Sequence, residues 1–209
     1  KTFIRGGSVI DKKVVSDEIK KMLRKYDNRK CKVYILHGDL TDEEMHSLYK
    51  SQDIDALVSL THGEGFGLPL FEAAYCGLPV LATDWSGHMD FLYKPTKDKK
   101  GKEKNKPHFA RVEYSLEPVP KDAVWDGVIQ KDSLWAYPQQ GSYKMKLREV
   151  YKDYGRFKSQ ASRLQTWLLE NFKSEKQLNK FKDIINEYFI ENVPDNEIDD
   201  LFERIAANS

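Results

Sequence analysis

Two glutamates eight residues apart, Glu64 and Glu72, frame the stretch of this chain that is best suited to chemistry. Between them lies the glycine-rich sequence Gly-Phe-Gly-Leu-Pro, residues 65–69. Glycines let a backbone come close to a ligand, and the free N–H groups at the start of a helix favour an anion. The pattern predicts a turn that can hold a phosphorylated ligand, with one carboxylate in the turn and the other in the helix after it.

The residues around this turn have the pattern of a strand and a helix. An apolar run, residues 54–60, precedes the turn, Pro69 suits the first positions of a helix, and Gly77 suits its end. In parallel sheets, ligands bind at the carboxyl ends of the strands. We therefore expect Glu64 to lie at the ligand-binding edge of such a sheet.

The string Glu-Gly-Phe-Gly-Leu-Pro-x-x-Glu-Ala, residues 64–73, resembles the E-x7-E motif of the retaining, nucleotide-sugar-dependent glycosyltransferases of family 4 (glycosyl transferases group 1), which have the GT-B fold. The similarity continues through Gly-Leu-Pro-Val at 77–80 and Ser86-Gly87. It covers roughly residues 31–92, and more loosely the helical C-terminus. The resemblance implies that residues 1–209 form a single nucleotide-sugar-binding domain, the C-terminal donor-binding half of a GT-B enzyme.

The family moves a sugar from a nucleoside diphosphate to an acceptor hydroxyl with retention at the anomeric carbon. By resemblance, Glu64 is the catalytic residue, acting through charge and positioning rather than as a nucleophile, and Glu72 holds the ribose hydroxyls. Backbone amides at the helix start stabilise the departing diphosphate. No cofactor and no metal are implied beyond the nucleotide sugar. The implied donor-binding residues are His62, Gly63, Gly65, Phe66, Gly67, Leu68 and Glu72, with Gly38 and Leu40 as weaker candidates for lining the base.

Structural interpretations stand beside these functional ones. Glutamates in a first helical turn often only match the helix dipole, although the string around Glu72 favours a functional role. His62 lines the sugar site or simply hydrogen-bonds the loop, and the sequence favours neither. His88, Asp84 and Asp90 have no metal-site spacing. Ser86-Gly87 is expected to shape the floor of the sugar pocket, and the aromatic residues of 125–143 either fill a core or stack on a sugar.

Along the chain, the patterns predict an α/β fold, a Rossmann-like parallel sheet flanked by helices. Strands are expected at 1–5, 32–36, 54–60 and 79–83, and a helix at 16–27. Thr41 and Glu44 form a capping box for another helix. The lysine-rich segment 94–108 is expected to be a solvated, mobile insertion or hairpin tip. Residues 142–206 are expected to be helical, with breaks at Gly155, before Ser174 and at Pro194.

The totals exclude several functional classes. With 34 basic and 33 acidic side chains, the net charge of +1 gives no field that would attract nucleic acid. No apolar run approaches the roughly 20 residues of a transmembrane helix. Cys31 and Cys76 are expected to be small core residues in a reducing compartment, and the sequence predicts a cytoplasmic location.

The family's opening strand and helix, whose basic residues clamp the diphosphate, find no counterpart when strands are counted back from residue 54. We therefore expect that unit and the N-terminal GT-B domain to lie outside this chain, and the isolated chain to bind nucleotide weakly without transferring sugar. A rival register makes Arg5 with Lys12 or Lys13 the clamp. The acceptor, a glycan or a lipid, is not indicated.

Two other functions are considered. One is a GT-B relative with different chemistry, such as a sugar-nucleotide epimerase, whose pattern fits the Glu64 to Glu72 string less well, or a phosphorylase, whose cofactor-bearing lysine pattern is not seen. The other is a non-catalytic module that holds a nucleotide or glycan in the same cleft.

Overall fold

A computed structural model describes residues 9–189 of the chain. The chain divides into two compact units, Lys1–Leu48 and Tyr49–Ser209, which are described separately. The strand expected at 1–5, the clamp residue Arg5 and the last helix expected after Pro194 lie outside the described residues.

The first unit contains α1 (Val9–Leu23) and η1 (Arg24–Tyr26), where the sequence predicts a helix over 16–27. Helix α2 (Asp42–Lys50) begins at the predicted capping box. The Thr41 amide donates to Glu44 Oε2 at 2.8 Å, and the Glu44 amide donates to Thr41 Oγ1 at 3.2 Å. This reciprocal pair satisfies two donors that the first helical turn leaves free.

The strand predicted at 32–36 is not formed, and this prediction is wrong. Its side chains are exposed, Tyr34 at 82% and Leu36 at 67%. A β-prone run becomes a strand only where a neighbour takes its backbone hydrogen bonds, and this segment pairs with no described strand. Cys31, expected in the core at its start, is exposed as well, whereas Cys76 is half-buried.

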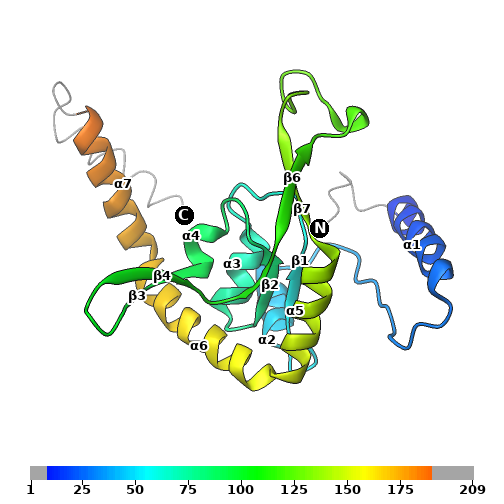
Figure 1. The fold of residues 1–209 in the computed structure, drawn as a ribbon, viewed down its shortest axis with the longest axis horizontal. Helices are drawn as coiled ribbons and strands as arrows, with labels where there is room; N and C mark the ends of the chain where they lie inside the picture. Colours follow the sequence, from blue (N-terminus) through cyan, green and yellow to red (C-terminus); the bar gives the residue numbers. More distant parts are fainter. Residues whose placement is uncertain (1–8, 190–209) are drawn as a thin grey trace. The chain divides into compact units, whose positions relative to one another are not determined.

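The second unit is built on a parallel sheet of three strands, β1 (Leu57–Ser59), β2 (Val80–Thr83) and β5 (Ala110–Val112), in the order β1-β2-β5 (Figure 1). Leu57 pairs with Val80, and Leu81 with Ala110. All four residues of β2 are buried, as befits a central strand covered on both faces. The loops after the three strands therefore lie at one edge of the sheet.

Helices cover this sheet. Helix α3 (Leu68–Tyr75) packs against β1 and β2, α5 (Gln140–Lys152) packs against β5, and α6 (Tyr154–Asn171) packs against both α3 and α5. Helix α7 (Ser174–Phe189) follows, and α4 (Met89–Leu92) lies after β2. One core cluster joins the sheet to α5 and α6 through Leu81, Ala110, Val112, Val150 and Phe157. The α/β parallel-sheet class with a helical C-terminus is confirmed.

Helix α3 ends where the sequence predicts, at Gly77. The backbone of Gly77 is left-handed, with φ of 72°. The Gly77 amide donates to the Ala74 carbonyl at 3.0 Å, and the Leu78 amide donates to the Ala73 carbonyl at 2.9 Å. This is the glycine-terminated helix end in which the last carbonyls are satisfied locally. Gln165 of α6 donates to the Tyr75 carbonyl at 3.0 Å, so α6 fixes the same helix end.

Two antiparallel hairpins extend from the sheet (Figure 1). Strands β3 (Tyr93–Lys97) and β4 (Glu103–Pro107) carry the lysine-rich segment, which forms an antiparallel hairpin, one of the two forms expected for it. Strands β6 (Tyr114–Pro118) and β7 (Leu134–Pro138) form a second ribbon, with η2 (Lys121–Ala123) in the connection between them.

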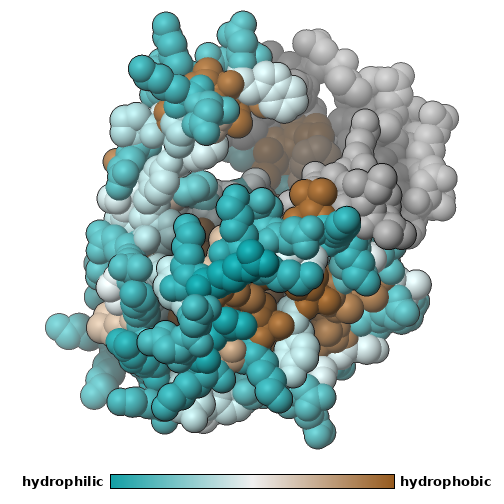
Figure 2. Space-filling view, turned by 90° about the vertical axis from the view of Figure 1, so that its right-hand side faces the viewer, coloured by the Kyte–Doolittle hydropathy of each residue, from teal (hydrophilic) through white to brown (hydrophobic). Residues whose placement is uncertain are grey.

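Hydrophilic side chains dominate the face drawn in Figure 2, with smaller apolar groups between them. Within residues 9–189, no helix combines the length and the apolar character that crossing a membrane requires.

Candidate functional site

The loop between β1 and α3, residues 60–67, carries the predicted site residues His62 and Glu64 to Gly67 at the carboxyl edge of the sheet. Gly67 is the residue before α3, with φ of 86°, and its carbonyl accepts from the Leu70 and Phe71 amides at 2.9 and 3.0 Å. A left-handed backbone at this point requires glycine, because a side chain there would be strained and would crowd His88.

The loop after β2 holds this glycine-rich loop in place. The Glu64 amide donates to Ser86 Oγ at 2.7 Å, the Gly87 amide donates to the Glu64 carbonyl at 3.1 Å, and Thr83 Oγ1 donates to the Thr61 carbonyl at 3.2 Å. A Cβ on Gly87 would lie 1.8 Å from the Gly65 carbonyl oxygen, so only glycine permits this approach. Ser86-Gly87 was expected to shape a sugar pocket, and the contacts show that it fixes the backbone of the Glu64 loop.

The amides of Gly65, Phe66, Gly67 and Leu68 donate no hydrogen bond to any described residue. A Cβ built on Gly65 meets nothing within 4 Å, so the backbone there faces open space. The beginning of α3 lies directly after these amides, and its dipole adds partial positive charge. The arrangement can receive an anion without first breaking a protein contact.

Glu64 is half-buried, and its carboxylate has no hydrogen bond or ion pair with another described side chain. Its backbone is held at both the amide and the carbonyl, as described above. A carboxylate on a fixed backbone with no protein partner is suited to hold hydroxyl groups of a ligand.

Glu72 lies on the second turn of α3 and has one hydrogen-bond partner that the sequence did not point to. Tyr49, at the end of α2, is 7% exposed, and its hydroxyl donates to Glu72 Oε2 at 3.1 Å. Burial, together with the charge of Glu72 and the hydrogen bond to it, raises the pKa of Tyr49 above its usual value. Tyr49 therefore remains a donor and orients one carboxylate oxygen, and no described cation neutralises Glu72 in an ion pair.

His62 packs against the second ribbon. Its ring stacks on Trp135 with centroids 4.9 Å apart, lies 4.5 Å from Tyr137, and its Nδ1 lies 2.9 Å from the Ala136 carbonyl oxygen. Because a carbonyl oxygen can only accept, Nδ1 carries the hydrogen of this bond, and Nε2 remains available for another partner. The hydrogen bond and the stacking together attach the glycine-rich loop to β7.

Two of the three residues considered as metal ligands, His88 and Asp84, have other partners. His88 is buried, with Nε2 2.7 Å from the Thr83 carbonyl oxygen. The Asp84 carboxylate accepts from Tyr93 at 2.8 Å and from Arg111 at 2.7 Å, and burial together with this Asp84 contact raises the pKa of Tyr93 to about 12. Within the described part of the chain, no three His, Cys, Asp or Glu side chains are grouped as metal ligands.

Of the remaining predicted residues, Gly63 lies close to Ser86, because a Cβ on Gly63 would be 3.6 Å from Ser86 Oγ. Gly63 therefore belongs to the loop that the residues after β2 hold in place. Leu68 is the first residue of α3 and is 57% exposed. Gly38 and Leu40 belong to the first unit. The candidate site consists of second-unit residues: the loop 60–67, the start of α3, Glu72 and Tyr49.

Comparison with known families gives one finding for this region. Residues 6–99 match the family described as Glycosyl transferases group 1, and the matched range includes both glutamates, the glycine-rich loop and Tyr49. No curated protein matches the chain. The family match supports a glycosyltransferase-type function.

Proposed function

We propose that the chain binds a nucleoside-diphosphate sugar at the loop 60–67 and serves as the donor-binding domain of a retaining glycosyltransferase with the GT-B fold. The single observation that carries this proposal is the run of four amides, Gly65 to Leu68, that donate to no described residue, beside the Glu64 carboxylate, which no described side chain engages. Phosphates fit the amides, and sugar hydroxyls fit the carboxylate.

The proposed roles follow from the positions of these groups. The amides and the start of α3 stabilise the negative charge that grows on the diphosphate as the bond to the sugar breaks. Glu64 holds sugar hydroxyls and offers negative charge to the oxocarbenium-like sugar. The acceptor oxygen bonds to the anomeric carbon on the face from which the diphosphate leaves, the hydroxyl proton passes to the departing diphosphate oxygen, and no protein nucleophile takes part. This gives transfer with retention.

Glu72 is proposed to accept hydrogen bonds from the ribose hydroxyls. An ionised carboxylate has two oxygens and about four acceptor positions, and Tyr49 occupies only one of them. The hydrogen bond from Tyr49 fixes the carboxylate before the nucleotide arrives, which lowers the ordering cost of binding.

Calorimetric titration of the purified chain with UDP, GDP and their glucose and mannose derivatives tests the proposal. We expect saturable binding of one base, with affinity lowered about tenfold or more in Glu72→Ala, because a charge-assisted hydrogen bond contributes roughly 1.5–3 kcal/mol. Glu43→Ala, on the exposed first turn of α2, is the matched control and leaves affinity unchanged. Equal affinity of Glu72→Ala and the unaltered chain would remove the ribose assignment.

A further inference from the structure

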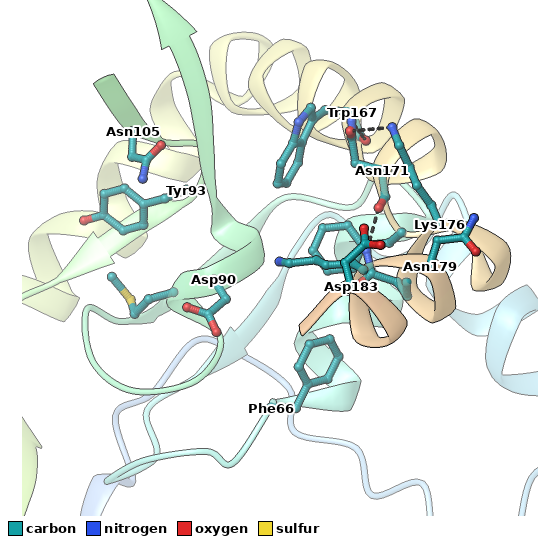
Figure 3. Close-up of a pocket in the computed structure, with 13 residues that line it drawn as sticks. Phe66, Asp90, Tyr93, Asn105, Trp167, Asn171, Lys176, Asn179 and Asp183 are labelled. Atoms are coloured by element: carbon teal, nitrogen blue, oxygen red, sulfur yellow. Dashed lines mark hydrogen bonds between the residues drawn. The ribbon is translucent and has the colours of Figure 1, made fainter. Parts of the chain in front are cut away.

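The second unit contains a large hollow beside the glycine-rich loop, lined among others by Phe66, Asp90, Asn105, Trp167 and Asp183 (Figure 3). We call it the Phe66 groove. Its volume is about 1100 Å³. Pockets for small molecules usually measure about 300–1,000 Å³, so the groove has room for more than one small ring.

Aromatic rings form part of its lining and connect it to the candidate site. Phe66 is 43% exposed and packs on Phe91 and Phe71 with centroids 5.0 and 5.3 Å apart. Phe71 in turn contacts Phe172 at 5.4 Å, and Phe172 contacts Trp167 at 5.6 Å. This row of rings runs from the loop next to Glu64 to the end of α6. Phe66, Trp167 and Phe172 line the groove and offer apolar surface to a ligand, whereas Phe71 and Phe91 support them from behind.

Four of the polar side chains in the lining are planar and make no hydrogen bond with another described residue. Asn105 comes from β4, Asp90 from α4, and Asn179 and Asp183 from α7. Side-chain amides donate to and accept from hydroxyl groups, and carboxylates accept from them, in both cases in a fixed plane.

The charges in the lining cancel. Asp90 and Asp183 are matched by Lys176 and Lys180. The Lys176 ammonium is already used, since it donates to Asn171 Oδ1 at 3.1 Å. A site for phosphate or another strong anion needs unbalanced basic groups, and a cation site needs unbalanced carboxylates. The lining instead fits a neutral ligand rich in hydroxyl groups.

Hydrogen bonds join the end of α6 to the first turn of α7. Lys176 Nζ donates to Asn171 Oδ1 at 3.1 Å, and Gln177 Nε2 donates to the Asn171 carbonyl at 2.7 Å. These contacts fix the start of α7, which carries Asn179 and Asp183, against the end of α6, which carries Trp167. A preformed site binds with a smaller ordering cost.

We propose that the Phe66 groove binds a neutral oligosaccharide. Pyranose rings present C–H bonds that stack on aromatic faces, and their hydroxyl groups pair with amides and carboxylates. Because Phe66 lies two residues after Glu64, a glycan in the groove lies next to the loop proposed to hold the donor. Its role as the acceptor rests on the proposed glycosyltransferase function, whereas its binding does not require a donor.

The test uses the full 209-residue chain without nucleotide. Maltotriose, cellotriose, mannotriose and chitotriose are titrated and followed by saturation-transfer NMR and calorimetry, with 3′-sialyllactose and inorganic phosphate as anionic probes. We expect at least one neutral trisaccharide to bind saturably, and the affinity to fall fivefold or more in Asn105→Ala and in Asp183→Ala. Lys104→Ala, next to Asn105 on β4, and Glu175→Ala, on α7 outside the groove, are the matched controls and keep the affinity.

Three results would overturn the inference. They are no saturable binding of any neutral trisaccharide, tighter binding of an anionic probe that weakens in Asn105→Ala and Asp183→Ala, and equal trisaccharide affinities in all four variants. Nucleotide titrations of the same variants separate this inference from the proposed function. If glycan binds in a way that depends on Asn105 and Asp183 but nucleotide does not bind, the groove proposal stands and the donor site is ruled out. If nucleotide binds but no glycan does, the donor site stands and the groove proposal is ruled out.

Discussion

Replacing Gly65 by alanine separates the ligand's requirements from those of the fold. The backbone of Gly65 lies outside the left-handed region, and the added methyl group meets nothing within 4 Å. A glycine-to-alanine change at such a position stabilises a protein by about 0.4–1 kcal/mol. For a chain of this length, that raises the melting temperature by about 1–4 °C.

The same methyl group enters the space that the proposed diphosphate needs. The diphosphate proposed to bind here fills the open space beside Gly65, and an added methyl carbon keeps ligand atoms roughly 3.5 Å away from itself. A ligand that packs closely on this backbone is therefore displaced, and its hydrogen bonds to the neighbouring amides lengthen. We expect the nucleotide Kd to rise tenfold or more, about 1.4 kcal/mol.

Thermal unfolding and calorimetry of Gly65→Ala, measured together, provide the assay. Gly87→Ala is the comparison, because its Cβ would lie 1.8 Å from the Gly65 carbonyl oxygen and must push the two loops apart by about 1.5 Å or more to reach an ordinary contact. We expect this variant to lose both stability and affinity. If Gly65→Ala binds nucleotide with the affinity of the unaltered chain, the nucleotide does not pack against Gly65. If the Gly65→Ala variant melts several degrees lower than the unaltered chain, the space around the Cβ position of residue 65 is not open.

Three further outcomes are expected. Tyr49→Phe removes the hydrogen bond to Glu72 and lowers nucleotide affinity about threefold to tenfold with the base preference retained, a change that calorimetry detects and that a purely structural tyrosine would not produce. Gly77→Ala lowers the free energy of unfolding, measured with denaturant, by about 1–3 kcal/mol, because φ of Gly77 is 72° and the added Cβ would lie 2.6 Å from Gln165 Oε1. A decrease of less than about 0.5 kcal/mol would contradict the role of this glycine. Burial and nearby basic groups lower the pKa of His108 below 6.5, so His108 is protonated more readily in the unfolded chain, and folding stability falls as the pH drops through 6.5. We expect His108→Gln to reduce the fall in melting temperature between about pH 7.5 and 5.5. An unchanged fall would mean that other groups cause the pH dependence.

The core of the candidate site could be predicted because its elements are specified locally. Pro69 and Gly77 mark the ends of α3 by their backbone preferences, and the capping box at Thr41 satisfies its own helix start. The breaks between α5, α6 and α7 likewise follow from helical apolar spacing interrupted near Gly155 and Ser174.

What the sequence did not indicate depends on contacts between distant residues. Tyr49 reads as an apolar position of α2, and only the fold brings its hydroxyl to Glu72, 23 residues further along the chain. The β6–β7 ribbon has no short hairpin turn, because its strands are separated by a long connection, so its pairing was missed. Residues 32–36 have β-prone side chains, but a strand needs a partner that local sequence does not report.

Backbone amide shifts in a ¹⁵N-labelled chain titrated with UDP and with GDP test the central claim most directly. The account predicts that the largest changes fall on Gly65, Phe66, Gly67 and Leu68, with saturation at the affinity found by calorimetry. Largest changes elsewhere, for example on the β3–β4 ribbon, with these four amides unmoved, would contradict it.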